Sequence, residues 1–126
     1  MLKTHSSSAI VAVRDIARAR KFYEETLGLE LADGGVDGPL VFRTGDTHLV
    51  VYPSEFAGTN QANAVVWAVG DEIESIAAEL KGRGVTFERY DMDGATFADG
   101  VHRMGDFRMV WFRDPDGNIL HLNSDG

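Results

Sequence analysis

Two segments of the chain change in the same way from a strand-like alternation of apolar residues to the spacing of an amphipathic helix. The first segment is SAIVAVRDIARARKFYEETLGLEL, and it predicts a strand over residues 8–14 followed by a helix over about 16–27. The second is AVVWAVGDEIESIAAELKGRGVTF, and it predicts a strand over 64–69 followed by a helix over about 72–82. The same local order of elements therefore occurs twice in the chain.

The two segments align at a constant offset, which makes them an internal repeat. Asp15 and Asp71 match, and both stand where a helix N-cap is expected. Glu74 follows Asp71 by three residues, as in a capping box. Gly28 and Gly84 also match, and both are expected to end their helices. The repeat predicts two structurally equivalent halves.

Further strand-like runs follow each helix, LVFRTG and THLVVYP in the first half and MVWFRD and NILHLNS in the second. We therefore expect an α+β fold in a single domain over 1–126, made of two tandem βαβββ modules at about 6–54 and 62–124. With the helices outside, the modules should form a curved sheet around a central cavity. The polar stretch 91–106, DMDGATFADGVHRMGD, is expected to be a long surface loop, either functional or a plain excursion.

Charge and composition narrow the possible partners and the location. The net charge of −8 and a pI near 4.8 argue against binding of nucleic acid, which requires a basic surface. The chain has no cysteine, which excludes disulfides, thiolate metal ligands and a cysteine nucleophile. The start of the chain, MLKTHSSS, lacks the apolar run of a signal peptide, and no segment has the ~18 apolar residues of a membrane span. We expect a cytoplasmic protein.

The stretch DPDGNILHLNS, residues 114–124, contains the strongest candidate for chemistry. Its first half is typical of a tight turn, and its second half alternates like a strand. Leu120 and Leu122 would face the core, so Ile119, His121 and Asn123 would face the other way. The alternation leaves open whether His121 is a wall residue, contacts a ligand or acts in acid–base catalysis.

The repeated module, the opening pattern VRDIARARKFYEETLGL and the closing pattern FRDPDGNILHL together resemble the vicinal oxygen chelate superfamily over nearly the whole chain. This superfamily includes glyoxalase I, bleomycin resistance proteins, fosfomycin resistance enzymes and extradiol dioxygenases. Its metal-dependent members hold a divalent ion with four cavity-facing side chains, and the resemblance places these at Ser8, Val51, Ala64 and His121, or at Tyr52 in place of Val51 if the register slips by one. One imidazole and one hydroxyl make a poor donor set, so we expect no tightly bound metal and no other cofactor.

Counting every second residue from the four positions that the resemblance supplies gives a cavity lining that is mostly apolar, and the resemblance also implies that Trp111 faces inward. The expected lining residues are Ser8, Ile10, Ala12, Leu49, Val51, Ala64, Val66, Ala68, Met109, Trp111, His121 and Asn123. Trp111 offers a stacking plane, and Trp67 should lie on the opposite face, under the helices or at a subunit contact. His102, in the long loop, is expected to be a solvated residue, and the alternative is that it reaches over the cavity.

The sequence leaves three classes of function open. A small-molecule-binding protein, with a partly aromatic or apolar ligand held in the cavity, needs only shape and a few hydrogen-bonding groups. A metal-free enzyme would use His121 as its general base. A metal-dependent lyase, isomerase or dioxygenase would need ligands that the chain does not offer at the expected positions. The resemblance also implies a homodimer.

Overall fold

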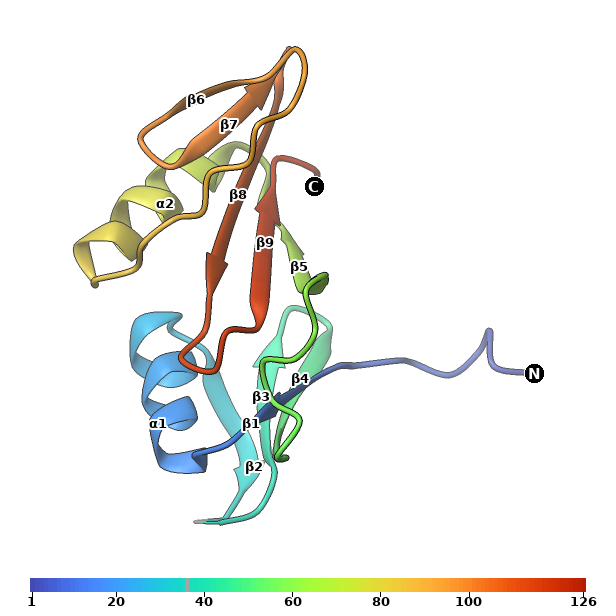
Figure 1. Cartoon of the computed structure of the whole chain (residues 1–126). Helices are drawn as coiled ribbons and strands as arrows, with labels where there is room; N and C mark the ends of the chain where they lie inside the picture. The colour runs from blue at the N-terminus through green and yellow to red at the C-terminus, as the bar shows by residue number, and fades with distance from the viewer. Residues whose placement is uncertain (36) are drawn as a thin grey trace.

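The computed structural model describes residues 1–35 and 37–126, and shows two modules that each combine one sheet with one helix (Figure 1). The elements of the first module are β1 (Ala9–Val13), α1 (Ile16–Lys21), a π-helical turn (Phe22–Thr26), β2 (Glu30–Gly34), β3 (Leu40–Thr44) and β4 (Thr47–Pro53). Those of the second are β5 (Asn63–Ala68), a 3₁₀ turn (Gly70–Glu72), α2 (Ile73–Gly82), β6 (Thr96–Ala98), β7 (Val101–Met104), β8 (Phe107–Arg113) and β9 (Ile119–Asn123). Among the described residues, no helix is long and apolar enough to cross a membrane.

The two sheets have equivalent strand orders, except that the second sheet has one further strand at its edge. The first runs β1-β4-β3-β2 and the second β5-β9-β8-β7-β6, and in each the strand that opens the module pairs in parallel with the strand that closes it. Both helices lie on the same side of the curved, open sheets, while the other sheet faces are left uncovered by helices (Figure 1). The predicted α+β fold of two repeated modules with the helices outside is confirmed.

The core lies between the helices and the sheets, and it follows the alternation along the strands. In β1, Val11 and Val13 are buried while Ile10 is exposed, which is the pattern of a strand with one covered face. Tyr23 stacks against Phe42 of β3, and Phe112 of β8 is buried in the second module. One face of each sheet therefore supplies the core.

The expected equivalence of the two helix caps is wrong. Asp15 caps α1, since its carboxylate accepts the backbone N–H of Arg18 at 3.1 Å. Asp71 instead lies in the 3₁₀ turn that precedes α2, and its carboxylate pairs with the Arg108 guanidinium at 3.0 Å. Glu74 also pairs with Arg108, so these ion pairs replace the capping box. The repeat therefore depends on strand order and not on matching caps.

Part of the expected loop 91–106 is a β-hairpin. β6 and β7 pair antiparallel, and they add a fourth strand after the helix of the second module. Asp99 and Gly100 join them with φ values of 54° and 83°, the two positive angles that a tight hairpin turn requires.

The DPDGN turn between β8 and β9 is a polar clamp. The Asp114 carboxylate accepts the backbone N–H groups of Asp116 and Asn118, both at 2.9 Å, which closes the turn. Its second oxygen accepts the hydroxyl of Tyr23 from the first module at 2.7 Å in a buried position. Burial raises the pKa of Tyr23, and the charge of Asp114 raises it further, so the phenol keeps its proton.

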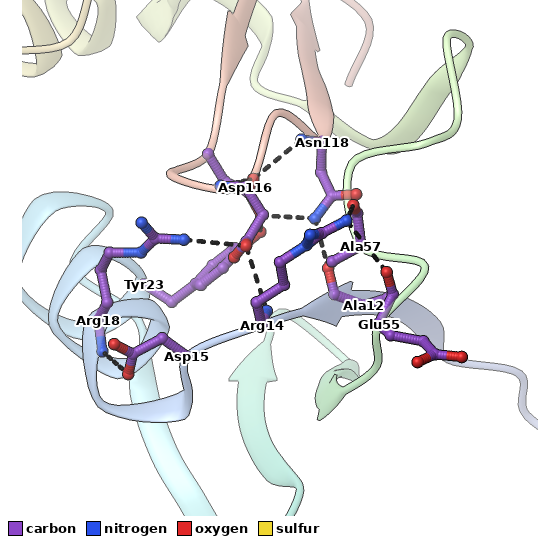
Figure 2. A network of polar contacts seen from close by, with 10 residues as sticks. Ala12, Arg14, Asp15, Arg18, Tyr23, Glu55, Ala57, Asp116 and Asn118 are labelled. Atoms are coloured by element: carbon purple, nitrogen blue, oxygen red, sulfur yellow. Dashed lines mark hydrogen bonds and ion pairs between the residues drawn. The ribbon is translucent and has the colours of Figure 1, made fainter.

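The same turn makes further bonds to the start of the first module, where the Arg18 guanidinium points toward Asp116 while the Arg14 guanidinium reaches the carbonyls of Glu55 and Ala57 (Figure 2). One Asp116 oxygen accepts the Arg14 backbone N–H at 3.2 Å and the Arg18 guanidinium at 2.9 Å. The Asn118 amide donates to the carbonyl of Ala12 at 2.7 Å. The DPDGN motif therefore joins the two modules. This structural role is sufficient to explain the residues of the motif, and no chemical role is needed.

Candidate functional site

His121 lies in the middle of β9, on the sheet face that the helices leave uncovered. Its neighbours in β9, Leu120 and Leu122, belong to the core, so the imidazole points the other way. It is in register with Val66 of β5 and with Trp111 of β8. We call the uncovered faces of the two sheets the open face. On the second sheet it carries Val66, Ala68, His102, Met109, Trp111, His121 and Asn123.

His121 is held in one tautomer. Its Nδ1 lies 3.1 Å from the carbonyl oxygen of Val110, which only accepts, so Nδ1 carries the proton. Nε2 is then an acceptor, and it lies 3.5 Å from the Asn123 amide nitrogen. Burial lowers the pKa of His121, against the opposing effect of the bond to Val110, so the ring is neutral at pH 7.

Trp111 is already stacked within the protein. The rings of Trp111 and His121 are 4.6 Å apart and only 22° from parallel. Tyr90 and His102 approach the same indole with their rings nearly perpendicular, at 5.3 and 5.0 Å. The expected stacking plane is therefore covered by His121 on one face, and a ligand can meet Trp111 only elsewhere.

His102 is a buried member of this aromatic cluster and not a solvated loop residue. It is 1% exposed in β7, 4.8 Å from the ring of Phe97, and its Nε2 accepts the backbone N–H of Tyr90 at 2.9 Å. Burial is the main cause that lowers the pKa of His102. Sequence reasoning missed Tyr90, Phe97 and His102, although Asp99-Gly100 between apolar residues is a known hairpin signal.

The expected position of Val51 in the cavity wall is wrong. Val51 is 0% exposed and is in register with Val11, and paired residues of parallel strands share a face, so it faces the helix-covered core. Leu49 is buried on the same face. The open-face positions of β4 are Val50, the partner of Ile10, and Tyr52, the alternative that a one-residue slip allowed.

Of the other predicted residues, some lie on the open face and others pack toward the core. Ile10 and Val66 are on the open face, 59% and 57% exposed, on strands β1 and β5 that contact each other. Ser8 is exposed and precedes β1. Ala64 lies at a register shift in β5 and packs against the core. Trp67 is in register with Leu122 on the helix-covered face, one of the two places expected for it.

The residues around His121 do not fit a divalent metal ion. Within residues 1–35 and 37–126, no group of three or more His, Cys, Asp or Glu side chains is placed to share an ion. The nearest open-face neighbours of His121 are Val66, Trp111 and Asn123, which offer at most one amide oxygen. The arrangement can instead accept a hydrogen bond at Nε2 beside an amide group, within an apolar and aromatic surface.

Comparison with known families agrees with this architecture. The sequence profile of the Glyoxalase/Bleomycin resistance protein/Dioxygenase superfamily matches residues 5–122. The chain belongs to this superfamily. A curated relative, the uncharacterized protein YetH of Bacillus subtilis (strain 168), is 28% identical over 119 residues that cover 89% of this chain and 91% of YetH.

Solved structures of the superfamily share the fold at low sequence identity. The fosfomycin resistance protein FosX from Mesorhizobium loti superposes with a TM-score of 0.71 at 16% identity, covering 100% of this chain and 95% of FosX. Lactoylglutathione lyase from Agrobacterium tumefaciens gives 0.68 at 16% identity, covering 95% and 92%. At these identities the likeness shows that this chain has the same fold as both proteins. Its chemistry has to be argued from its own residues.

Proposed function

We propose that this cytoplasmic protein binds a small, partly aromatic or apolar molecule on the open face, at His121 and Asn123 and without a tightly bound metal ion. The observation that carries the proposal is the neutral, tautomer-fixed imidazole of His121, whose Nε2 acceptor stands beside the Asn123 amide. The exposed apolar side chain of Val66 is in register with His121, and Ile10 is exposed on β1, the strand that contacts β5. An apolar wall with a few placed polar groups is the usual composition of a small-molecule site.

The ligand should carry a hydrogen-bond donor. Nε2 accepts only, because Val110 holds the proton on Nδ1, and the amide of Asn123 both donates and accepts. A phenol, enol or amide N–H on an apolar body matches this pair. A carboxylate presented to Nε2 would meet a lone pair and be disfavoured.

The open face also supports a homodimer. Ile10, Tyr52 and Val66 are exposed apolar or aromatic side chains on strands of both modules. A second copy placed over this face would remove them from water and enclose the ligand.

A metal-free enzyme is the second candidate, and the same imidazole favours it. A neutral His121 can take a proton at Nε2 from a bound substrate that displaces the long 3.5 Å contact with the Asn123 amide, and the Val110 carbonyl fixes the required tautomer. The superfamily includes proteins described as a lyase and as a resistance protein. Both candidates use the same residues, and they differ in whether the ligand is changed.

A panel of small aromatic molecules, in pairs with and without a hydroxyl or N–H donor, tests the binding site. In Trp67→Phe, whose remaining tryptophan is Trp111, donor-bearing members should change the fluorescence. Adding His121→Phe keeps a ring against Trp111 and removes Nε2, so affinity for donor-bearing molecules should fall about tenfold, which corresponds to one hydrogen bond. Their donor-free partners should bind equally to both variants.

Two outcomes separate the candidates and one rejects both. An unchanged ligand after long incubation supports the binding protein, while conversion by the wild type and not by His121→Phe supports the enzyme. Equal affinity of the two variants for every donor-bearing molecule would show that His121 does not contact the ligand.

A further inference from the structure

A hollow lies on the helix side of the sheets, between the two modules. Its wall consists of eight residues that are all aliphatic or aromatic, and its volume is about 160 Å³. Leu27 and Leu29 come from the segment between the first helix and β2, Ile76 and Leu80 from α2, and Trp67 and Phe112 from β5 and β8. We call this the inter-module cleft.

The inter-module cleft is separate from the open face. Trp67 is in register with Leu122, whose side chain faces the helices, whereas Trp111 is in register with His121 on the other face. The second sheet itself therefore lies between the two places. Each place contains one of the two tryptophans of the chain.

Arg83 bridges the two modules beside the cleft. α1 and α2 lie on the same side of the sheets, one over each module (Figure 1). Arg83, at the end of α2, donates from one guanidinium nitrogen to the carbonyls of Glu25 and Thr26 at 3.0 Å each, and from the other to Glu79 at 2.6 Å. The bonds to Glu25 and Thr26, which we call the Arg83 brace, link the end of α2 to the end of the π-helical turn, beside Leu80 and Leu27.

We propose that the inter-module cleft binds a small, uncharged apolar molecule of about the size of one aromatic ring. The cleft has about the volume and the kind of lining of an enclosed apolar cavity of ~150 Å³ that takes up benzene, but it is open to solvent on one side, so a bound ring would displace water from apolar walls. A charged ligand would lose its hydration without gaining a partner from these walls. Atoms that line an unfilled apolar space lack dispersion contacts, and a ring in the cleft supplies them.

The cleft has a route from solvent. Leu29 and Trp67 also line a neighbouring hollow that includes Glu30 and Arg43. These two charged side chains are 76% and 55% exposed and form a loose pair at 4.0 Å. A molecule can thus enter past the polar side chains of Glu30 and Arg43, and it loses its contact with water when it reaches Trp67.

Benzene titrated into protein with ¹³C-labelled leucine, isoleucine and valine methyl groups tests the proposal. We expect shifts at the methyl groups of Leu27, Leu29, Ile76 and Leu80, and none at Ile10 or Val66. Ile76→Phe places a ring in the cleft from the half-buried side of α2 and should weaken benzene binding at least about tenfold. Val66→Phe adds comparable bulk on the open face and should leave it unchanged.

Should Ile76→Phe fail to fold, Leu29→Phe fills the cleft from the other module and has the same expected effect. Shifts confined to Ile10 and Val66 would overturn the cleft and leave the open-face proposal intact. Absence of any saturable shift would also overturn it. So would shifts of the cleft methyl groups that depend on protein concentration alone, because a second copy would then occupy this surface.

Discussion

At the scale of single residues, two histidines that face the same way share one electrostatic property. Burial lowers the pKa of both His102 and His121 below the ordinary 6.5. Each ring is neutral, accepts at Nε2 and packs against Trp111. A neutral ring is compatible with an apolar ligand surface. Because protonating it in the folded protein is unfavourable, the free energy of unfolding should fall at acidic pH.

Acidification should destabilise the protein through these two rings. Below pH about 6.5 the unfolded chain binds protons that the folded chain does not, so the free energy of unfolding falls as the pH falls. Urea unfolding at pH 7.5 and 5.5 should show this loss, and the loss should be smaller in His102→Phe, which keeps an aromatic ring in the cluster. Equal pH dependence in the two proteins would contradict the role assigned to His102.

Tyr23 is the residue on which the inter-module clamp depends most. Tyr23→Phe removes the donor to Asp114 and leaves a carboxylate oxygen buried with one partner fewer, which should cost about 1–3 kcal/mol in the free energy of unfolding. Tyr52→Phe removes the same atom at an exposed position and should stay within about 0.5 kcal/mol of wild type. Urea unfolding of both variants measures the difference, and similar values would mean that the clamp contributes little.

At the scale of elements, the β6–β7 hairpin packs Phe97 against His102, and His102 contacts Trp111. One position of its turn, Gly100, accommodates only glycine. A Cβ on Gly100, at φ +83°, would lie 2.5 Å from the ring of Phe87. Gly100→Ala should therefore destabilise the protein by about 2 kcal/mol or more, through both backbone strain and the clash.

Gly94 is the matched control for this prediction. Its φ of +79° is similar, but no heavy atom of the described residues lies within 4 Å of the place of its Cβ. Gly94→Ala thus carries the backbone strain alone. Thermal unfolding should rank Gly100→Ala clearly below Gly94→Ala, and the reverse order would show that the hairpin does not pack against Phe87.

Local patterns predicted most of the elements, although the β6–β7 hairpin was expected to be a loop, and long-range contacts decided which side chains face the core and which cap a helix. The strands at 8–14 and 64–69 and both helices follow from periodicity, which depends only on near neighbours. Leu49, Val50 and Val51 are consecutive apolar residues, so alternation cannot say which of them faces the core, and pairing with β1 decides it. Arg108, distant in sequence, draws Asp71 away from the cap.

The site was predictable to a similar extent. His121 and Asn123 were placed on one face by the alternation around Leu120 and Leu122 in β9, whereas Val66 and Trp111 were placed by counting from positions that the resemblance supplied. The contact between His121 and Trp111 depends on their cross-strand pairing, which a single sequence does not contain.

At the scale of the whole molecule, each sheet is covered by a helix on one side only. The clamp and the Arg83 brace hold the modules together on the helix side, and β1 contacts β5 between the sheets. On the open face, apolar side chains of both modules remain exposed. A surface of this kind on a small protein is typical of an interface.

We therefore expect a homodimer formed through the open face. Light scattering at micromolar concentration should give twice the chain mass of 13.8 kDa. Val66→Lys places a charge in the centre of the expected interface, where burying it without a partner is unfavourable, and should raise the dissociation constant at least about tenfold. Ala78→Lys adds the same charge at an exposed position of α2 and should leave the dimer intact. A monomeric wild type would contradict the homodimer proposal. A dimer disrupted only by Ala78→Lys would show that the interface lies on the helix side, and the open face would then be available to the ligand alone.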